Sequence, residues 1–226
     1  MTEPATEGAA PDGRREQMLE AALDVIAERG FANTRIADVA SRAGTSAALV
    51  IYYFKARDLL LAEAIRLSED RWYAEGMRRM AATPTAAGRL EELIAMSCVP
   101  DESEDDPVSW VIWLDLWAQS ARNDQVAMVR AEFDDHWRRT IADLVREGQR
   151  SEEFHPLDAE DFAVTLSALI DGFAIQIALE DGSVDNQRAF QLTMQFAAER
   201  LGFDWAPHRR RPAGAGRAAD RARTTT

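Results

Sequence analysis

Apolar residues recur every three or four positions along nearly the whole chain, and the alternation typical of strands is almost absent. Many of the breaks between these periodic stretches contain glycine or proline, which interrupt helices. The pattern therefore predicts an all-α protein. We expect nine helices, with approximate bounds 14–29, 34–41, 45–54, 57–81, 85–98, 108–121, 123–149, 158–180 and 186–202.

The predicted helices fall into two groups. Three short helices occupy residues 14–60 and six longer ones occupy residues 61–206, so the boundary lies at the long fourth helix. A flexible arm (1–13) is expected before them. The Arg-rich, low-complexity tail (207–226) has a composition typical of disorder, and phosphate contacts are the alternative role for its arginines.

The net charge of −13 argues at first against a nucleic-acid partner. The charge is unevenly spread, however. Residues 1–60 carry 7 basic and 9 acidic side chains, residues 61–206 carry 13 and 29, and the tail carries 6 and 1. A nearly neutral N-terminal part can still present a small surface to DNA.

The composition also limits the location and chemistry of the protein. We expect no membrane span, because no stretch approaches the roughly 20 apolar residues that cross a bilayer. The acidic N-terminus does not resemble a signal peptide. One cysteine, Cys98, excludes an internal disulfide, and three well-separated histidines leave little for a metal site. The prediction is a cytoplasmic protein with no membrane contact, cofactor or metal.

The most specific pattern is RIADVASRAGTSAALVIYYF, residues 35–54, in which two short helices flank a turn at Gly44. Thr34 is a suitable N-cap for the first helix, and Thr45 or Ser46 for the second. The second helix is too short to stand alone, so its neighbours must hold it while its first turn stays free. Such a helix fits the major groove of DNA. A helical hairpin without DNA contact is the alternative.

This region resembles the DNA-binding domain of the TetR family of one-component transcriptional regulators. The resemblance covers residues 14–62 and is carried by Gly30-Phe31, Thr34, Ile36–Ala40, Ala43–Ser46, Tyr53-Phe54 and Lys55–Leu60. It favours DNA binding over a bare hairpin. It also implies a nine-helix homodimer, a C-terminal effector pocket and a regulator that usually represses, with activation as the less common mode.

The resemblance further implies which residues contact double-stranded operator DNA. Positions that match phosphate contacts are Thr34, Tyr52, Tyr53 and Lys55. Positions that would face the groove are Arg35, Thr45, Ser46, Ala47 and Ala48. Because few of these side chains form hydrogen bonds, we expect modest specificity assisted by thymine methyl contacts and DNA shape.

Aromatic residues mark the expected sixth helix. Trp110, Trp113 and Trp117 fall on one face of it. Core packing is the more common role of such a stripe, and the wall of a ligand cavity is the other.

Two lone acids interrupt apolar segments of the C-terminal part. They are Asp115 and Asp171. A buried acid must be paired, solvated or in contact with a ligand. The alternatives to a ligand are a neighbouring helix end or an arginine such as Arg122 or Arg130.

The segment from Trp110 to Phe203 resembles the C-terminal domain of betaine-operon-type repressors, which include choline sensors. The resemblance is carried by Trp113–Ala118, Trp137-Arg138, Gly148, Glu153-Phe154 and Ala168–Gly172. Aromatic rings with an acid suit an amine or a quaternary ammonium ion, and a hydrophobic compound is the alternative effector. The candidate pocket residues are Trp110, Trp113, Asp115, Trp117, Phe133, Trp137, Asp171 and Phe173.

The last two predicted helices each have two apolar faces, which favours a partner helix on the second face. We expect a twofold dimer with these interface residues: Phe162, Leu166, Leu169, Phe190, Met194, Ala197 and Leu201. The dimer would place two recognition helices one DNA turn apart on a palindrome. An effector would move the sixth helix against the fourth and release the DNA.

Two other classes of protein compete with this interpretation. An all-helical enzyme is disfavoured because no phosphate-binding glycine loop, zinc-binding HExxH or nucleophile elbow occurs. His136 beside Asp134 or Asp135 is more simply a solvated helix face, and the acidic loop 101–106 a solvated loop. A helical adaptor that binds only protein is the second rival. We therefore predict a ligand-responsive transcriptional regulator and not an enzyme.

Overall fold

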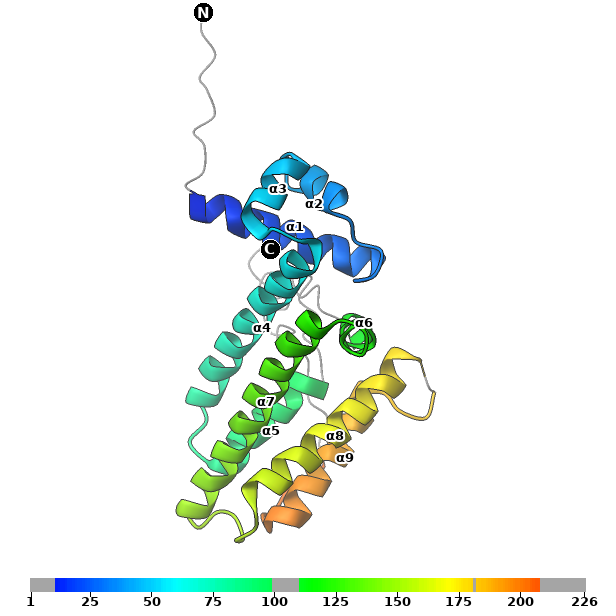
Figure 1. Ribbon diagram of the computed structural model, residues 1–226. Helices are drawn as coiled ribbons and strands as arrows, with labels where there is room; N and C mark the ends of the chain where they lie inside the picture. The colour runs from blue at the N-terminus through cyan, green and yellow to red at the C-terminus, as the bar shows by residue number, and fades with distance from the viewer. Residues whose placement is uncertain (1–10, 99–109, 181, 208–226) are drawn as a thin grey trace, which may run out of the picture. The chain divides into compact units, whose positions relative to one another are not determined.

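The computed structural model describes residues 11–98, 110–180 and 182–207, and these residues form helices without any strand (Figure 1). The all-α prediction is confirmed. The helices are α1 (Pro11–Arg29), α2 (Ile36–Arg42), α3 (Ala47–Phe54), α4 (Arg57–Ala81), α5 (Ala86–Cys98), α6 (Trp110–Ser120), α7 (Asp124–Arg150), α8 (Ala159–Ala178) and α9 (Asn186–Leu201). Their bounds lie within a few residues of those expected from the sequence.

By packing, the chain divides into two compact units that do not follow chain order. The first comprises residues 1–70 and 107–129, and the second comprises 71–106 and 130–226. Helices α4 and α7 therefore contribute to both units. The sixth helix, which the sequence analysis assigned to the C-terminal domain, packs within the first unit together with α1, α2 and α3.

The first unit is built around the apolar face of α1. Its predicted stripe of Met18, Ala22, Val25 and Ile26 is buried, as are Val39 and Ala40 of α2 and Val50 and Phe54 of α3. These side chains hold α2 against α1 and α3 against α2. Ion pairs between α1 and α2 flank the apolar contact. This core fixes α3 from its inner side, and a helix of only eight residues needs such packing to be stable.

In the second unit, α5, α8 and α9 pack against one another, and α8 and α9 run side by side (Figure 1). Asp158 and Asp185 begin α8 and α9 by accepting backbone N–H bonds from Asp161 and Arg188, at 2.9 and 2.7 Å. Glu153 does the same for α5, since its carboxylate accepts from the backbone nitrogens of Ala86 and Ala87, both at 3.1 Å. These carboxylates satisfy N–H groups that helices leave open.

Among the described residues, α8 alone is long and apolar enough to cross a membrane, by length and composition only. Core helices of soluble proteins have the same features, and α8 packs on α5 and α9.

Two expectations are corrected within the described residues. Residues 11–13, expected in the flexible arm, belong to α1. Thr34 does not cap α2, because Arg35 is the N-cap residue and makes no side-chain capping bond. In α6, Ile112 and Leu116 are fully buried, whereas the three tryptophans are half-buried.

The predicted dimer interface is also corrected. Phe162, Leu166, Phe190, Met194, Ala197 and Leu201 are 0–4% exposed within the single chain, and Leu169 is half-buried. Six of the seven residues therefore form the core between α8 and its neighbours. The large apolar side chains that α8 and α9 leave exposed are Val164, Ile175, Leu179 and Leu192.

Candidate DNA-binding and effector sites

The turn before α3 positions the candidate recognition helix. Gly44 adopts φ +62°, a left-handed conformation that other residues rarely adopt. The Thr45 N–H bonds to the Ala40 carbonyl at 2.9 Å, which fixes the turn to α2. The Ser46 hydroxyl then caps α3 by accepting from the Leu49 N–H at 3.2 Å. Of the two caps that the sequence offered, the structure uses Ser46.

The far end of α3 carries the aromatic and cationic candidates. Tyr52 is 68% exposed, and its ring meets that of Tyr53 edge to face at 5.6 Å. Lys55 Nζ donates to the Tyr52 carbonyl at 2.6 Å and lies 5.0 Å from the Tyr52 ring. Lys55 also has φ 65°, which turns the chain from α3 into α4. Together with exposed Ala48, these groups form the outer face of α3.

The predicted phosphate contact of Thr34 is contradicted by the structure. Its side chain is fully buried, and the hydroxyl donates to the Gly30 carbonyl at 2.9 Å. Its carbonyl accepts from Arg57 Nε at 2.6 Å. Thr34 therefore shapes the loop between α1 and α2. The sequence pattern identified the position but could not tell a hydroxyl used internally from one facing DNA.

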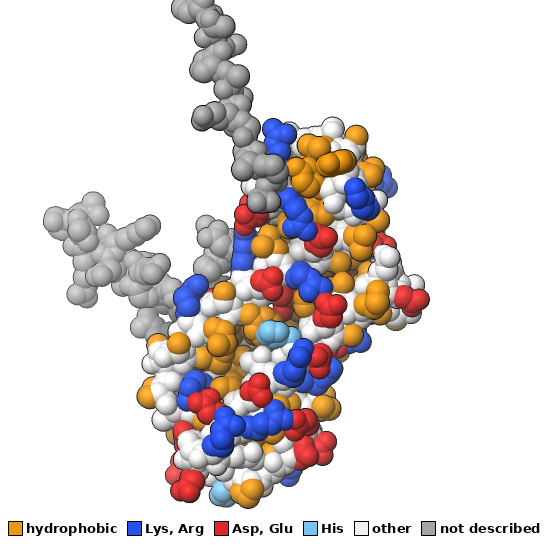
Figure 2. All heavy atoms as spheres, turned by 60° about the vertical axis from the view of Figure 1, so that its left-hand side comes forward, with side chains coloured by type: hydrophobic (Ala, Val, Ile, Leu, Met, Phe, Trp, Pro, Cys, Tyr) orange, Lys and Arg blue, Asp and Glu red, His pale blue; other side chains and the backbone are white. Residues whose placement is uncertain are grey.

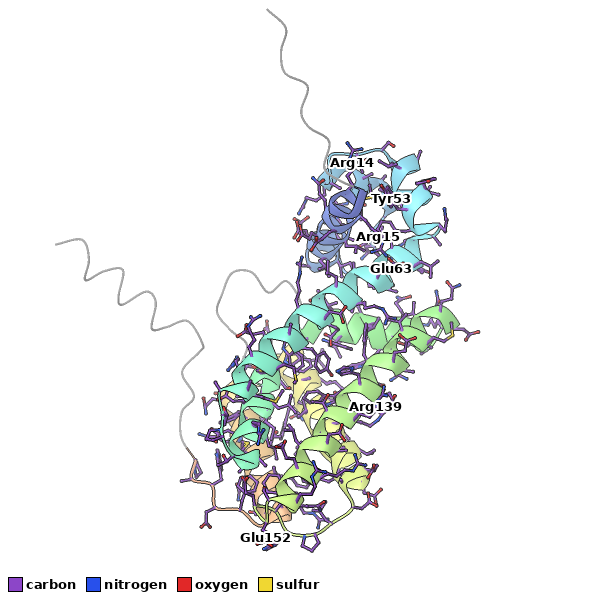
Figure 3. The ribbon with its side chains drawn as sticks, turned by 90° about the vertical axis from the view of Figure 1, so that its left-hand side faces the viewer. Arg14, Arg15, Tyr53, Glu63, Arg139 and Glu152 are labelled. Carbon is purple, nitrogen blue, oxygen red and sulfur yellow. The ribbon has the colours of Figure 1, made fainter. Side chains whose placement is uncertain are left out.

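Some basic side chains of this region form ion pairs within the fold, and others have no acidic partner and are free to contact an anion such as DNA. Arg15 pairs with Glu63, as Figure 3 shows, Arg29 pairs with Asp38, Arg42 with Asp24 and Glu28, and Arg57 with Asp58. Among the described residues, the exposed cations of this region without an acidic partner are Arg14, Arg35 and Lys55. Arg35 and Lys55 were predicted from the sequence, whereas Arg14 was missed.

On the face shown in Figure 2, basic and acidic side chains are interspersed. To an anionic partner, this face therefore offers local cations among acids rather than a basic field.

The predicted effector residues do not gather in one unit. Trp110, Trp113, Asp115 and Trp117 lie in the first unit, and Phe133, Trp137, Asp171 and Phe173 in the second. The rings of Trp113 and Trp117 lie 6.3 Å apart on α6.

Asp115 has a partner that the sequence could not reveal. Its Oδ2 accepts a hydrogen bond from the Phe31 backbone nitrogen at 2.8 Å. Of the partners considered for Asp115, this contact is nearest to a neighbouring helix end, because Phe31 lies just after α1. The carboxylate joins α6 to the loop after α1.

Asp171 of α8, in the second unit, has a strongly raised pKa. Partial burial, together with the charge of nearby Asp134, raises its pKa from 3.8 to about 6, while Arg130 and Arg138 oppose the shift. Burial likewise raises the pKa of Asp134, which pairs with Arg130 on the same helix. The Asp171 carboxylate has no hydrogen bond or ion pair within the described residues.

Aromatic rings accompany these acids. Trp137, on the face of α7 that also carries Asp134, lies 5.8 Å from Trp72 of α4, ring centre to ring centre. Trp72 was missed in the sequence analysis, because one tryptophan in a charged helix gives no periodic signal. We name Asp134, Asp171, Trp72 and Trp137 the acid–tryptophan cluster.

The remaining candidates from the sequence were His136, a metal site, the acidic loop and the Arg-rich tail. His136 is exposed and its ring lies 4.2 Å from that of Tyr73. No group of three or more His, Cys, Asp or Glu side chains that could hold a metal ion occurs in the described residues. The acidic loop 101–106 and residues 208–226 of the tail lie outside them.

Comparisons with known proteins identify two family models that follow each other along the chain. The model for bacterial regulatory proteins of the tetR family matches residues 18–64, and that for the C-terminal part of BetI-type transcriptional repressors matches residues 86–202. The HTH-type transcriptional regulator BetI of Escherichia coli K12 is 30% identical over 193 residues, which cover 84% of this chain and 95% of that protein.

Solved structures give the same picture. A transcriptional regulator from Saccharomonospora viridis, determined in complex with choline, is 31% identical, with a TM-score of 0.74 over 84% of this chain and 98% of that one. A TetR-family regulator from a Rhodococcus species is 25% identical, with a TM-score of 0.73 over 84% and 99%. These relatives are transcriptional regulators and not enzymes. The chain belongs to the TetR family of bacterial transcriptional regulators, and its C-terminal part is of the BetI repressor type.

Proposed function

We propose that this protein is a cytoplasmic repressor that binds a palindromic operator as a homodimer and is released by an organic cation. Two copies of α3 would enter adjacent major grooves, about one helical turn apart. Arg35, at the start of α2, and Lys55, at the end of α3, would bind the DNA backbone or base edges around the exposed face of α3. Their exposure and lack of acidic partners support this role.

The observation that best supports a cationic effector is that the half-buried Asp171 carboxylate has no hydrogen-bond or ion-pair partner in the described residues. A half-buried carboxylate without a partner is unfavourable in an unliganded protein, and its raised pKa reports that cost. A bound cation would provide the missing charge. An anionic effector would instead meet the charges of both Asp134 and Asp171.

Trp72 and Trp137 indicate which chemical class of cation the site would bind. Indole rings attract cations through their faces, and quaternary ammonium groups suit such rings because they cannot donate hydrogen bonds. Trp72 and Trp137 thus support a trimethylammonium compound such as choline. The relative from Saccharomonospora viridis, determined in complex with choline, supports the same class.

Release of the operator follows from differential affinity. The effector can lower DNA affinity only if it binds the DNA-released conformation more tightly than the DNA-bound one. We propose that the cation favours a position of α6 and α4 in which the two copies of α3 no longer match the spacing of the operator.

Titration calorimetry with choline tests the effector class. Wild-type protein is expected to bind choline at least tenfold more tightly than its neutral carbon isostere, in which a tert-butyl group replaces the trimethylammonium group. Asp171→Asn should remove this preference. Asp135→Asn is the matched control, because Asp135 of α7 is exposed and pairs with Arg139. Equal affinity of the wild type for both compounds would refute the cation proposal.

The operator claim needs its own experiment. A gel shift with the intergenic DNA upstream of the protein's own gene should give a sequence-dependent complex that choline dissociates. A protein-only adaptor would give no such complex.

A further inference from the structure

We propose that Asp115 and Asn123 are coupling residues that hold the loop between α1 and α2, and with it the recognition helix, in the operator-binding position. They tie α6 and the turn after it to the DNA-binding helices through two hydrogen bonds. All the residues involved lie in the first unit. The part of this proposal that concerns the effector response rests on the cation effector proposed above.

The first tie is the bond from the Phe31 backbone nitrogen to Asp115 Oδ2, at 2.8 Å. Its geometry depends on Gly30, because a Cβ at that position would lie 2.6 Å from the same oxygen. Gly30 also has φ +77°, which favours glycine. Phe31 itself is 1% exposed and anchors the loop in the core. A charged acceptor makes this bond stronger than one between neutral groups.

The second tie comes from the turn between α6 and α7. Asn123 Nδ2 donates to Asp58 Oδ2 at 2.7 Å, and Asp58 Oδ1 accepts from Arg57 at 2.6 Å. The same Asn123 side chain begins α7, since its Oδ1 accepts from the backbone nitrogens of Gln125 and Val126 at 3.0 and 3.3 Å. The start of α7 and the start of α4 are thus held by one amide.

Both ties converge on the loop between α1 and α2. Arg57, which Asp58 orients, donates to the Phe31 carbonyl and to the Thr34 carbonyl, the latter at 2.6 Å. The guanidinium also lies 5.4 Å from the centre of the Phe31 ring. Residues 30–34 are therefore bonded from α6 on the nitrogen side of Phe31 and from α4 on its carbonyl side.

The held loop leads directly into the helix-turn-helix. It ends at α2, and α2 contacts α3 through packing and through the bond from Thr45 to Ala40. A displacement of α6 would therefore pull on residues that position α3. Without the ties, α2 and α3 would sample orientations that do not fit the operator, and the competent fraction would fall.

The experiment compares Asp115→Ala, which removes the acceptor, with Asp115→Asn, which keeps a neutral one. Affinity is measured by fluorescence anisotropy on a duplex that wild-type protein selects from a random pool, at fixed salt and without effector. We expect Asp115→Ala to bind about tenfold more weakly and Asp115→Asn to stay within threefold of wild type. The Phe31 amide should exchange at least tenfold faster in Asp115→Ala.

Glu153→Ala is the matched control for a general loss of stability. It also removes a carboxylate that accepts backbone N–H bonds, but at the start of α5 in the second unit. Its operator affinity should stay within twofold of wild type.

Asn123→Asp tests the second tie independently. Aspartate begins a helix as well as asparagine does, so α7 keeps its cap. The donor to Asp58 is lost, however, and two carboxylates then face each other. We expect at least a fivefold loss of operator affinity with an unchanged circular dichroism spectrum. This variant keeps the proposal testable if Asp115→Ala does not fold.

Operator affinity within twofold of wild type in both Asp115→Ala and Asn123→Asp would overturn the proposal. Adding choline separates it from the effector proposal. If choline weakens operator binding by the wild type, the ratio of affinities with and without choline should shrink at least threefold in Asp115→Ala. If choline has no effect on the wild type, the effector proposal fails, while the affinities without effector still decide the coupling role.

Discussion

At the scale of single residues, DNA binding by this acidic protein depends on very few cations. Four arginines of the first unit are used internally: Arg15, Arg29 and Arg42 join α1 and α2 to each other or to α4, and Arg57 holds the loop after α1. Arg35 is exposed, has no acidic partner and begins α2. Replacing Arg35 should therefore lower the affinity for the operator and leave the stability of the fold unchanged.

Arg35→Ala should lower operator affinity about tenfold and reduce the slope of log affinity against log salt by about one, if it contacts a phosphate. Arg42→Ala is the control, because its guanidinium pairs with Asp24 and Glu28. We expect the control to keep the wild-type salt slope. Anisotropy titrations at several salt concentrations measure both, and equal slopes for all three proteins would contradict the role of Arg35.

The raised pKa of Asp171 predicts a gain of stability when the charge is removed. The folded protein holds this proton up to a pKa of about 6, whereas the unfolded chain releases it near the ordinary value of 3.8. Asp171 therefore lowers the free energy of unfolding progressively as pH rises from about 4 to 6, and fully above pH 6.

Asp171→Asn should consequently be more stable than wild type by about 1 kcal/mol at pH 7.5, after allowance for solvent screening, and by less at pH 5. Urea denaturation at the two pH values measures the difference. A variant that is more stable yet binds choline more weakly is typical of a residue kept for binding. A destabilised variant at pH 7.5 would instead indicate that the carboxylate is well paired in solution.

At the scale of elements, the end of α7 depends on one glycine. The Phe154 ring packs directly over Gly148, where a Cβ would overlap its edge, and the Phe154 nitrogen bonds to the Gly148 carbonyl at 3.0 Å. Phe154 is 4% exposed and contacts Phe203 after α9. The Gly148 and Glu153-Phe154 pattern therefore has a packing reason, independent of any ligand.

Gly148→Ala should destabilise the protein by about 2 kcal/mol and lower Tm by about 4–8 °C, because the added methyl displaces the ring. In the background of Phe154→Leu, the same change should cost less than half as much, since the smaller side chain leaves room. Thermal unfolding of the four proteins gives this cycle. Additive effects would show that the ring does not meet the added methyl.

The sequence predicted the helices well because apolar periodicity and helix caps are local signals. The sequence could not predict which apolar face of a helix packs inside its own protomer and which stays exposed. Helices α8 and α9 each offer two apolar faces, and the pattern gives no sign that Phe162 and Phe190 face their own protomer. The partners of Thr34 and Asp115 could not be predicted for a related reason, since they are backbone atoms of the loop after α1.

At the scale of the whole molecule, packing and chain order divide the protein differently. The sequence placed a boundary near residue 60, but residues 107–129 pack with the N-terminal helices. Contacts between segments far apart in sequence produce this division, so no local pattern could predict it. The proposed coupling residues, Asp115 and Asn123, belong to the unit that contains α3. The acid–tryptophan cluster belongs to the other unit.

The exposed apolar side chains of the last two helices predict how two copies meet. Val164, Ile175, Leu179 and Leu192 are 38–70% exposed in the single chain. An apolar surface on two neighbouring helices can be buried against the same surface of a second copy in a twofold dimer. A dimer would also raise operator affinity, because the second α3 binds its half-site at a high effective concentration once the first is bound.

The double variant Leu179→Glu and Leu192→Glu should therefore elute as a monomer and bind a palindromic operator at least a hundredfold more weakly, while its affinity for a single half-site is unchanged. Light scattering after gel filtration and anisotropy with whole and half operators measure these quantities. Met77→Glu is the control, because Met77 of α4 is 59% exposed and should remain so in the dimer. A dimeric double variant with wild-type operator affinity would mean that the two copies meet through another surface, and that these four side chains are exposed for a different reason.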